Sequence, residues 1–186
     1  MKKMIFAALL LSGLGIQAQA QTQKYFTRDG KIQFSASTPM EKIDATSKGT
    51  TAVVDAASGA IEFAVLVKGF LFERALMQEH FNENYLESDK FPKATFKGKI
   101  QESTSVKWTK DGDYPVKVKG TLTIHGVSRE VTTDARISVK GGKILATTKF
   151  DVAVADYNIK IPSVVADKVA RIVTITVEAG LSELKK

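Results

Sequence analysis

The sequence predicts an all-β protein, an eight-stranded antiparallel β-barrel with a short helical insertion. Three observations carry this prediction. Most of the chain alternates apolar and polar residues with a period of two, and pairs of turn-forming residues separate the alternating runs. One segment in the middle of the chain instead shows a helical period.

The alternating runs place the apolar side chains of each strand on one face of a sheet. The apolar residues that alternate in this way are Ile32, Phe34 and Ala36; Ile61, Phe63, Val65 and Val67; Ala94, Phe96, Gly98 and Ile100; Val131, Ala135, Ile137 and Val139; and Ile144, Ala146 and Phe150. In the run from Val116 to Ile124 we predict a change of phase at Gly120. The last run is the most regular and contains Val169, Val173, Ile175, Val177 and Ala179. A weaker pair of strands is expected around Ile43 and Val53.

Turn signals separate these runs and favour hairpin connections, so neighbouring strands should be antiparallel. The signals are Asp29-Gly30, Ser58-Gly59, Asp111-Gly112 and Gly141-Gly142. Closing such a sheet into a barrel buries one face and removes both edges. An eight-stranded barrel has an interior that side chains can fill or that can hold one small ligand. Both alternatives are open here, with Phe34, Phe63, Phe96 and Phe150 predicted to face inward.

Residues 70–86 break the alternation. Phe72, Ala75 and Leu76 fit a helical period, and the surrounding Glu, Gln, Arg and Met residues favour a helix. We predict one or two short helices here, ended by Pro92, and a second irregular stretch at residues 156–167. The helical insertion carries more apolar residues than an exposed helix needs, so it should cap or flank one end of the barrel and act as a gate.

The first 20 residues have the layout of a secretory signal peptide. Lys2 and Lys3 precede an apolar run from Met4 to Leu11, and Ala18-Gln19-Ala20 is a cleavage site with small residues. The alternative, a membrane-spanning helix, needs about 20 apolar residues, which this stretch lacks. We therefore expect a signal peptide at residues 1–20, one mature domain at residues 21–186, and a periplasmic or secreted location.

Composition narrows the possible partners. The chain of 186 residues has no Cys, which excludes disulfides and thiolate chemistry, and a net charge of +7. The Lys residues are scattered and not interleaved with aromatic residues, so no nucleic acid partner is predicted. They suit a solvated surface or a transient contact with an anionic membrane surface. The sequence leaves the oligomeric state open, and a homodimer is one option.

The sequence gives no support to a catalytic or metal site. His80 and His125 do not share a metal-ligand spacing, and no nucleophile motif or phosphate-binding loop is present. Glu79 and Glu83 share a helix face and are expected to be solvated. We expect no cofactor, His125 in an exposed turn, and Trp108 either at the barrel rim or packed beneath a loop.

Two motifs resemble those of the YceI-like lipid-binding family. The first is FLFERALMQEHFNENYLESDKFPKATF at residues 70–96, in which Met77, His80, Phe81, Tyr85 and Phe91 to Phe96 match the family's middle motif. The second is GTLTIHGVSREV at residues 120–131, which resembles a strand-turn-strand motif of the family. The closing run DKVARIVTITVEA at residues 167–179 is also similar. The resemblance covers essentially the whole mature chain. His125 stands where Arg is common, and residues 156–162 differ from the commonest version of their loop.

This resemblance implies an exported, lipocalin-like barrel that binds a polyisoprenoid or quinone-like lipid without chemistry, its tail in the lumen and its head near the mouth. The ligand-binding residues we then expect, in the lumen and at the mouth, are Phe34, Phe63, Met77, His80, Phe81, Phe96 and Phe150. His80 would either hydrogen-bond the lipid head or hold the helix on the barrel wall. The alternative function is a structural or interaction barrel of the cell envelope with a filled core, and a third reading is an enzyme acting on a lipid.

Overall fold

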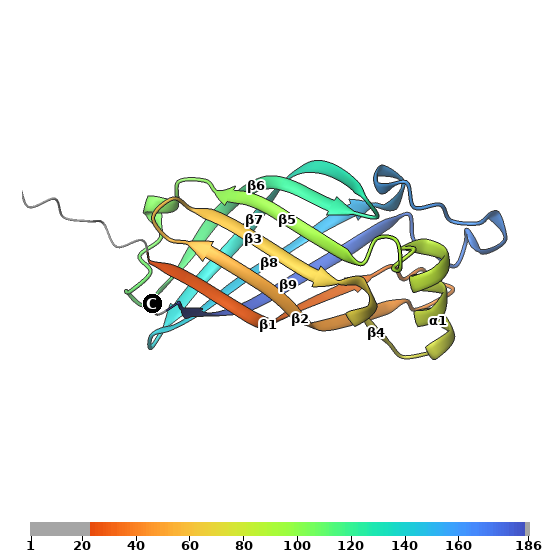
Figure 1. The fold of residues 1–186 in the computed structure, drawn as a ribbon, viewed down its shortest axis with the longest axis horizontal. Coiled ribbons are helices and arrows are strands. Elements are labelled where there is room, and N and C mark those ends of the chain that lie inside the picture. Colours follow the sequence, from red (N-terminus) through yellow and green to blue (C-terminus); the bar gives the residue numbers. More distant parts are fainter. Residues whose placement is uncertain (1–22, 185–186) are drawn as a thin grey trace, which may run out of the picture.

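Eight antiparallel strands close into an elongated barrel (Figure 1). The computed structural model describes residues 23–184, so the predicted signal peptide lies outside the described residues. The strands run in the order β1-β9-β8-β7-β6-β5-β3-β2, and pairing of β1 with β2 completes the circle. The predicted fold class is confirmed. The barrel strands are β1 (Lys24–Ser35), β2 (Asp44–Asp55), β3 (Ala60–Leu66), β5 (Lys93–Ile100), β6 (Gly112–Ile124), β7 (Val127–Lys140), β8 (Lys143–Ala153) and β9 (Ile172–Glu183).

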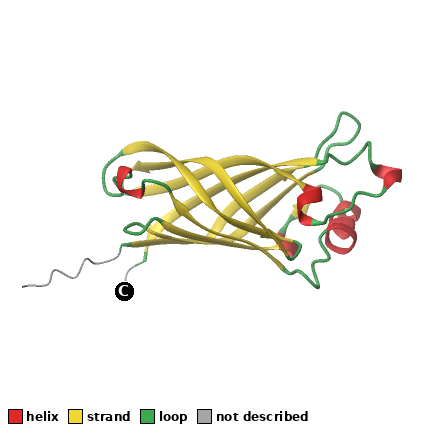
Figure 2. Cartoon of the chain, turned by 90° about the horizontal axis from the view of Figure 1, so that it is seen from above, coloured by secondary structure: helices red, strands yellow, loops and turns green. Residues whose placement is uncertain are grey.

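The helical insertion lies at one end of the barrel, which we call the helical end (Figure 2). It contains the two-residue strand β4 (Leu71–Phe72), the helix α1 (Ala75–His80) and a π-helical turn η2 (Phe81–Tyr85). The helices expected in residues 70–86 are therefore present, but the first residues of that range are extended because β4 pairs with β2. No helix among the described residues is long and apolar enough to cross a membrane.

Short 3-10 turns make up the remaining helical structure. They are η1 (Val67–Gly69), η3 (Ser103–Ser105), η4 (Val154–Tyr157) and η5 (Ser163–Val165). The last two belong to the connection between β8 and β9, which also lies at the helical end (Figure 1). Val169, expected in the last strand, lies in this connection, since β9 begins only at Ile172.

Two glycines differ from their predictions: Gly30 was expected in a turn, and Gly120 at a change of phase. Gly30 lies inside β1, at a point where the register shifts. The neighbouring strand approaches closely there, since a β-carbon on Gly30 would lie 3.1 Å from the Thr50 carbonyl oxygen. The strand therefore bends at Gly30 and continues. Gly120 keeps the register of β6 and faces Gly98 across the β5–β6 ladder. The Phe96 ring fills the space above this pair: a β-carbon at Gly120 would lie 2.7 Å from its Cζ.

The barrel is packed in one half. At the end opposite the insertion, a large cluster of inward side chains is buried, with exposed fractions of at most 8 %. Tyr25 stacks on Trp108 there, with ring centroids 5.1 Å apart. Trp108 thus packs beneath its loop, which was one of its two predicted placements. This packed half gives the chain, which has no Cys, a continuous core.

Candidate functional site

The other half of the barrel is hollow. A cavity of about 230 Å³ runs from the Phe34 and Phe81 rings at the helical end to Val54, Ile61 and Leu181 at the packed half. Several of the inward side chains that surround it, among them Phe63, Phe96 and Phe150, are only half-buried, although they share the register of the buried ones. We call this cavity the lumen. The predicted alternative, a filled core, therefore describes only the half of the barrel away from the helices.

The wall of the lumen is almost entirely apolar. Thr133 and Thr148 face it from β7 and β8, but their hydroxyls turn into the wall. The two hydroxyl oxygens lie 3.1 Å apart, and they lie 3.2 and 2.7 Å from the main-chain carbonyl oxygen of Asp134. Each can donate to that carbonyl, so the polar atoms are satisfied locally and methyl groups remain for the lumen. Such a space suits a hydrocarbon chain and gives a polar group no partner.

Five of the seven predicted site residues line the lumen: Phe34, Phe63, Phe81, Phe96 and Phe150. They come from five different elements, and the register explains their convergence. Phe63 pairs with Phe96 across β3 and β5, and Phe150 pairs with Ile175 across β8 and β9. Residues paired in this way share one face of the sheet.

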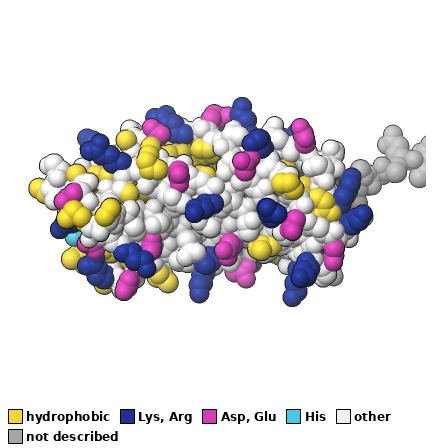
Figure 3. Space-filling model, turned by 180° about the vertical axis from the view of Figure 1, so that it is seen from behind, with side chains coloured by type: hydrophobic (Ala, Val, Ile, Leu, Met, Phe, Trp, Pro, Cys, Tyr) yellow, Lys and Arg dark blue, Asp and Glu magenta, His cyan; other side chains and the backbone are white. Residues whose placement is uncertain are grey.

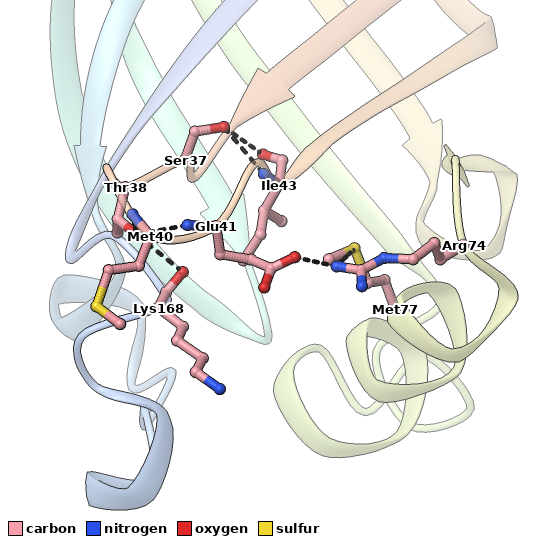
Figure 4. Close-up of polar contacts among 8 residues, drawn as sticks. All are labelled: Ser37, Thr38, Met40, Glu41, Ile43, Arg74, Met77 and Lys168. Carbon is pink, nitrogen blue, oxygen red and sulfur yellow. Dashed lines mark hydrogen bonds and ion pairs between the residues drawn. The ribbon is translucent and has the colours of Figure 1, made fainter.

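Met77 and His80 do not line the lumen, and His80 is exposed. Their place at the mouth, within reach of a ligand, stays a prediction. The helix α1 buries none of its residues because it lies across the rim and the insertion contacts the barrel through Phe72 and Phe81. The Met77 sulfur instead lies 3.6 Å from the Arg74 guanidinium (Figure 4).

Phenylalanines close the lumen at the helical end. Phe34 of β1 contacts the rings of Phe70, Phe72 and Phe81, with centroids 5.3 to 5.7 Å apart. Phe81 itself lies 5.0 Å from Phe72 and 5.9 Å from Phe70. The insertion therefore caps this side of the lumen with an aromatic cluster, and the predicted position of the insertion is correct.

Polar contacts tie the three segments of the helical end together. Figure 4 shows Glu41, in the β1–β2 connection, paired with Arg74 of the insertion. From the same connection, the Thr38 hydroxyl donates to the carbonyl of Lys168, at 3.5 Å, in the β8–β9 connection. These contacts join loops that are far apart in the sequence.

His125 forms a further link and corrects another prediction. We expected an exposed turn residue, but only 11 % of its side chain is exposed. Nε2 lies 2.7 Å from a Glu87 carboxylate oxygen and Nδ1 lies 3.1 Å from the Tyr157 carbonyl. The Phe91 ring packs edge-on at 4.7 Å. The left-handed backbone of His125 and Gly126 forms the tight β6–β7 turn that delivers this side chain.

Residues 23–184 contain no group of three His, Cys, Asp or Glu that could hold a metal. Burial raises the pKa of Tyr25 and of Tyr157 above the usual value, which favours the neutral phenol. On the face shown in Figure 3, Lys, Arg, Asp and Glu side chains are scattered over the barrel wall. Sequence reasoning found the lumen through its phenylalanines, whereas the contacts of His125 depend on segments that no local pattern connects.

Comparison with known proteins agrees with this geometry. The model of the YceI-like domain matches residues 18–181. A polyisoprenoid binding domain from Saccharophagus degradans, described as implicated in plant cell wall breakdown, superposes with a TM-score of 0.76 at 12 % identity, covering 88 % of this chain and 100 % of that one. BcnA of Burkholderia cenocepacia gives 0.68 at 17 % identity, with 82 % and 96 % covered. A YceI protein of Campylobacter jejuni gives 0.56 at 21 % identity, with 75 % and 83 % covered. At these identities the likeness establishes the fold. Curated protein sequences gave no match.

Proposed function

The chain belongs to the YceI-like domain family, and on that premise we propose that it is an exported, non-catalytic protein that holds a hydrophobic lipid by its tail in the barrel lumen. The lipid class that we propose is a polyisoprenoid or a similar amphiphile with a long apolar chain. The observation that carries the proposal is the hollow, apolar half of an otherwise well-packed barrel.

The size of the lumen sets how much of a chain it can hold. An apolar cavity of about 150 Å³ accommodates one benzene molecule. By that measure the 230 Å³ lumen holds roughly ten carbon atoms, or about two isoprene units. Burying ten such groups contributes about 8 kcal/mol of transfer free energy before the costs of immobilising the ligand. A longer chain therefore extends out of the lumen or displaces part of the phenylalanine cluster.

The polar head belongs outside the lumen. The two threonine hydroxyls are engaged by the wall, and a buried polar head without a partner would cost several kcal/mol. The likeness to a polyisoprenoid binding domain supports the same class of ligand. It does so through the fold, since the two chains share 12 % identity.

Extraction of the lipid tests this function. The folded protein is purified without detergent, extracted with organic solvent and examined by mass spectrometry, with a stoichiometric lipid as the expected result. Ala146→Phe should fill the lumen and abolish the bound lipid, whereas Leu145→Phe, on the outer face of the same strand, should retain it. Repeated absence of lipid from the unsubstituted protein, or equal lipid in both variants, would contradict the proposal.

Export is a separate part of the proposal and rests on the N-terminal residues alone. Cleavage after Ala20 should leave Gln21 as the first residue of the mature protein, in the periplasm or outside the cell. N-terminal sequencing of protein recovered from the periplasmic or culture fraction checks this. A mature protein that keeps Met1 would contradict it.

A further inference from the structure

The barrel wall is incompletely paired between β7 and β8. β6 and β7 pair along their whole common length, from Gly112↔Val139 to Ile124↔Val127. The pairing of β7 with β8 begins at Lys140↔Lys143 and ends at Ala135↔Thr148. Residues 127–134 of β7 and residues 149–153 of β8 are not paired with each other, and we call this unpaired stretch the seam. In Figure 1 the β6–β7 hairpin bows outward toward the helical end, where the seam lies.

The seam borders the hollow half of the barrel. Val131 and Thr133 on its β7 side, and Phe150 and Val152 on its β8 side, all line the lumen. On the other side of β8, pairing with β9 continues to Ala153↔Ile172. A chain that passed through that ladder would break main-chain hydrogen bonds, whereas the seam has none to break.

Both ends of the seam are fixed. At the inner end the Thr148 hydroxyl donates to the Asp134 carbonyl at 2.7 Å, next to the last paired position. At the outer end His125 at the hairpin tip contacts the carbonyl of Tyr157 in η4, and Tyr157 is buried. The seam is therefore a bounded stretch of wall without main-chain pairing, separate from the end capped by the phenylalanines. Side chains fill it: Val131 and Phe150 pack against a cluster that contains the buried Tyr157.

The side chain of Arg129 is a cation that belongs to the inner face of the seam. Arg129 pairs with Leu122, which lines the lumen, so both residues belong to the inner face. Every other inner-face residue of strands β5 to β8 is uncharged. Arg129 is exposed, and it makes no ion pair or hydrogen bond within residues 23–184. It lies close enough to Tyr157 to lower the pKa of that hydroxyl, against the larger effect of burial and that of Asp156, which both raise it.

Carboxylates near the seam are mostly engaged elsewhere. On the outer face, Glu130 accepts from the Thr121 hydroxyl at 2.9 Å, and Asp134 pairs with Lys117 at 2.6 Å. Asp151 accepts from the Thr174 hydroxyl at 2.7 Å. Asp156 is the acid on the η4 side. The inner edge of the seam thus keeps one positive charge beside an apolar space.

We propose that the seam is the route by which the ligand's head leaves the lumen, between side chains that can part without breaking main-chain hydrogen bonds, and that Arg129 binds this head, which is anionic. The inference rests on the proposed function and specifies it: the ligand is an apolar chain that ends in a phosphate or a carboxylate. The guanidinium suits both, because its planar set of N–H donors matches two oxygens of such a group. The tail occupies the lumen and the head sits at the wall.

Matched ligands test the role of Arg129. Binding of farnesyl phosphate and farnesol, and of dodecanoate and dodecanol, is measured by calorimetry for the unsubstituted protein, Arg129→Gln and Lys140→Gln. Lys140 is the control because it is exposed on the same strand but lies in the paired stretch and away from the lumen. We expect the preferred acid to bind about tenfold more weakly to Arg129→Gln, with the alcohol unchanged and Lys140→Gln like the parent.

The outcomes separate the inference from the function. If the parent binds phosphate, carboxylate and alcohol alike, or if Arg129→Gln weakens acid and alcohol equally, the head-group site is wrong and the lipid-binding function stands. If the parent binds no apolar chain at all, both fail. The phosphate and carboxylate arms identify which anionic head the site accepts.

Cross-linking tests the seam as a route, since the chain has no Cys of its own. A short bifunctional thiol reagent joins Thr132→Cys to Asp151→Cys across the seam. Thr121→Cys with Glu130→Cys, joined within the β6–β7 ladder, is the control. Glu41→Cys with Arg74→Cys locks the helical end instead.

We expect release of a preloaded fluorescent fatty acid to slow at least tenfold only when the seam is joined. Unchanged release from the seam-locked protein, or slowing only when the helical end is locked, would overturn the seam as the route.

Discussion

Truncation of Phe150 should separate the two halves of the barrel by their energetics. Phe150 and Ile144 both face inward from β8, but Phe150 lines the lumen whereas Ile144 is 4 % exposed within the packed half. A Phe→Ala change in a packed core costs about 3–5 kcal/mol. The Phe150 ring has neighbours on the wall side and empty space on the other, so Phe150→Ala should cost only about 2 kcal/mol. Ile144→Ala, which leaves a cavity among close neighbours, should cost about 3–4 kcal/mol despite its smaller side chain.

Lipid binding should show the opposite order. Phe150→Ala removes a surface that the tail contacts, so affinity should fall about tenfold, equivalent to about 1.4 kcal/mol. Ile144→Ala should leave affinity within about twofold once the variant is folded, because its side chain is not part of the lumen wall in the hollow half. Urea denaturation without lipid gives the free energies of unfolding, and fluorescence titration with a labelled fatty acid gives the dissociation constants. Greater destabilisation by Phe150→Ala than by Ile144→Ala, with equal lipid binding, would refute the division into a packed and a hollow half.

Further substitutions examine other features of the fold. Gly120→Ala should destabilise the protein by about 1–3 kcal/mol in urea denaturation, since the new β-carbon would overlap the backbone of β5. Gly180→Ala is the control and should not destabilise it, because no atom lies within 4 Å of the new β-carbon. Equal effects of the two substitutions would contradict the close approach of β5 and β6. His125→Asn keeps a residue that tolerates the left-handed turn but removes the contact with Glu87, so hydrogen exchange should rise in the insertion and in η4, and unchanged protection would show that the link holds neither segment. Main-chain N–H groups, that of Ser58 foremost, lower the pKa of Asp55, so its contribution to stability is present above the usual pKa of about 4 and is lost as the pH falls through the lowered value. Urea midpoints measured from pH 7 to pH 2 should therefore show an advantage over Asp55→Asn that disappears only in acid.

The packed half of the barrel must supply most of the stability of the fold, because the hollow half buries less apolar surface. Stability comes from the apolar area removed from water, and the lumen residues contribute less of it than the buried ones. With no disulfide available, the well-packed end with Tyr25 and Trp108 supplies the core that the hollow end lacks. The ligand, when bound, would add its own stabilisation by mass action. Thermal stability that rises with added lipid is therefore the expected behaviour of this barrel.

The alternation of apolar residues was enough to predict the barrel and most of its lumen. Period two is a local property, so it assigned Phe63, Phe96 and Phe150 to the inner face without knowledge of strand partners. The helical period of residues 75–80 was equally local. Asp29-Gly30 misled because a turn dipeptide and a strand bend use the same residues, and the neighbouring strand decides between them.

Only the tertiary structure decided which part of the inner face surrounds empty space. Ile144 and Phe150 follow the same alternation on one strand, yet Ile144 is packed and Phe150 borders the lumen. The difference arises because the side chains opposite them come from distant segments of the chain. The seam has the same origin: the apolar pattern of β7 continues through residues 127–134, but the loss of its pairing with β8 is set by the path of the hairpin in space. The contacts of His125 with Glu87 and the Tyr157 carbonyl have the same origin, since they form between segments whose proximity no local sequence pattern encodes.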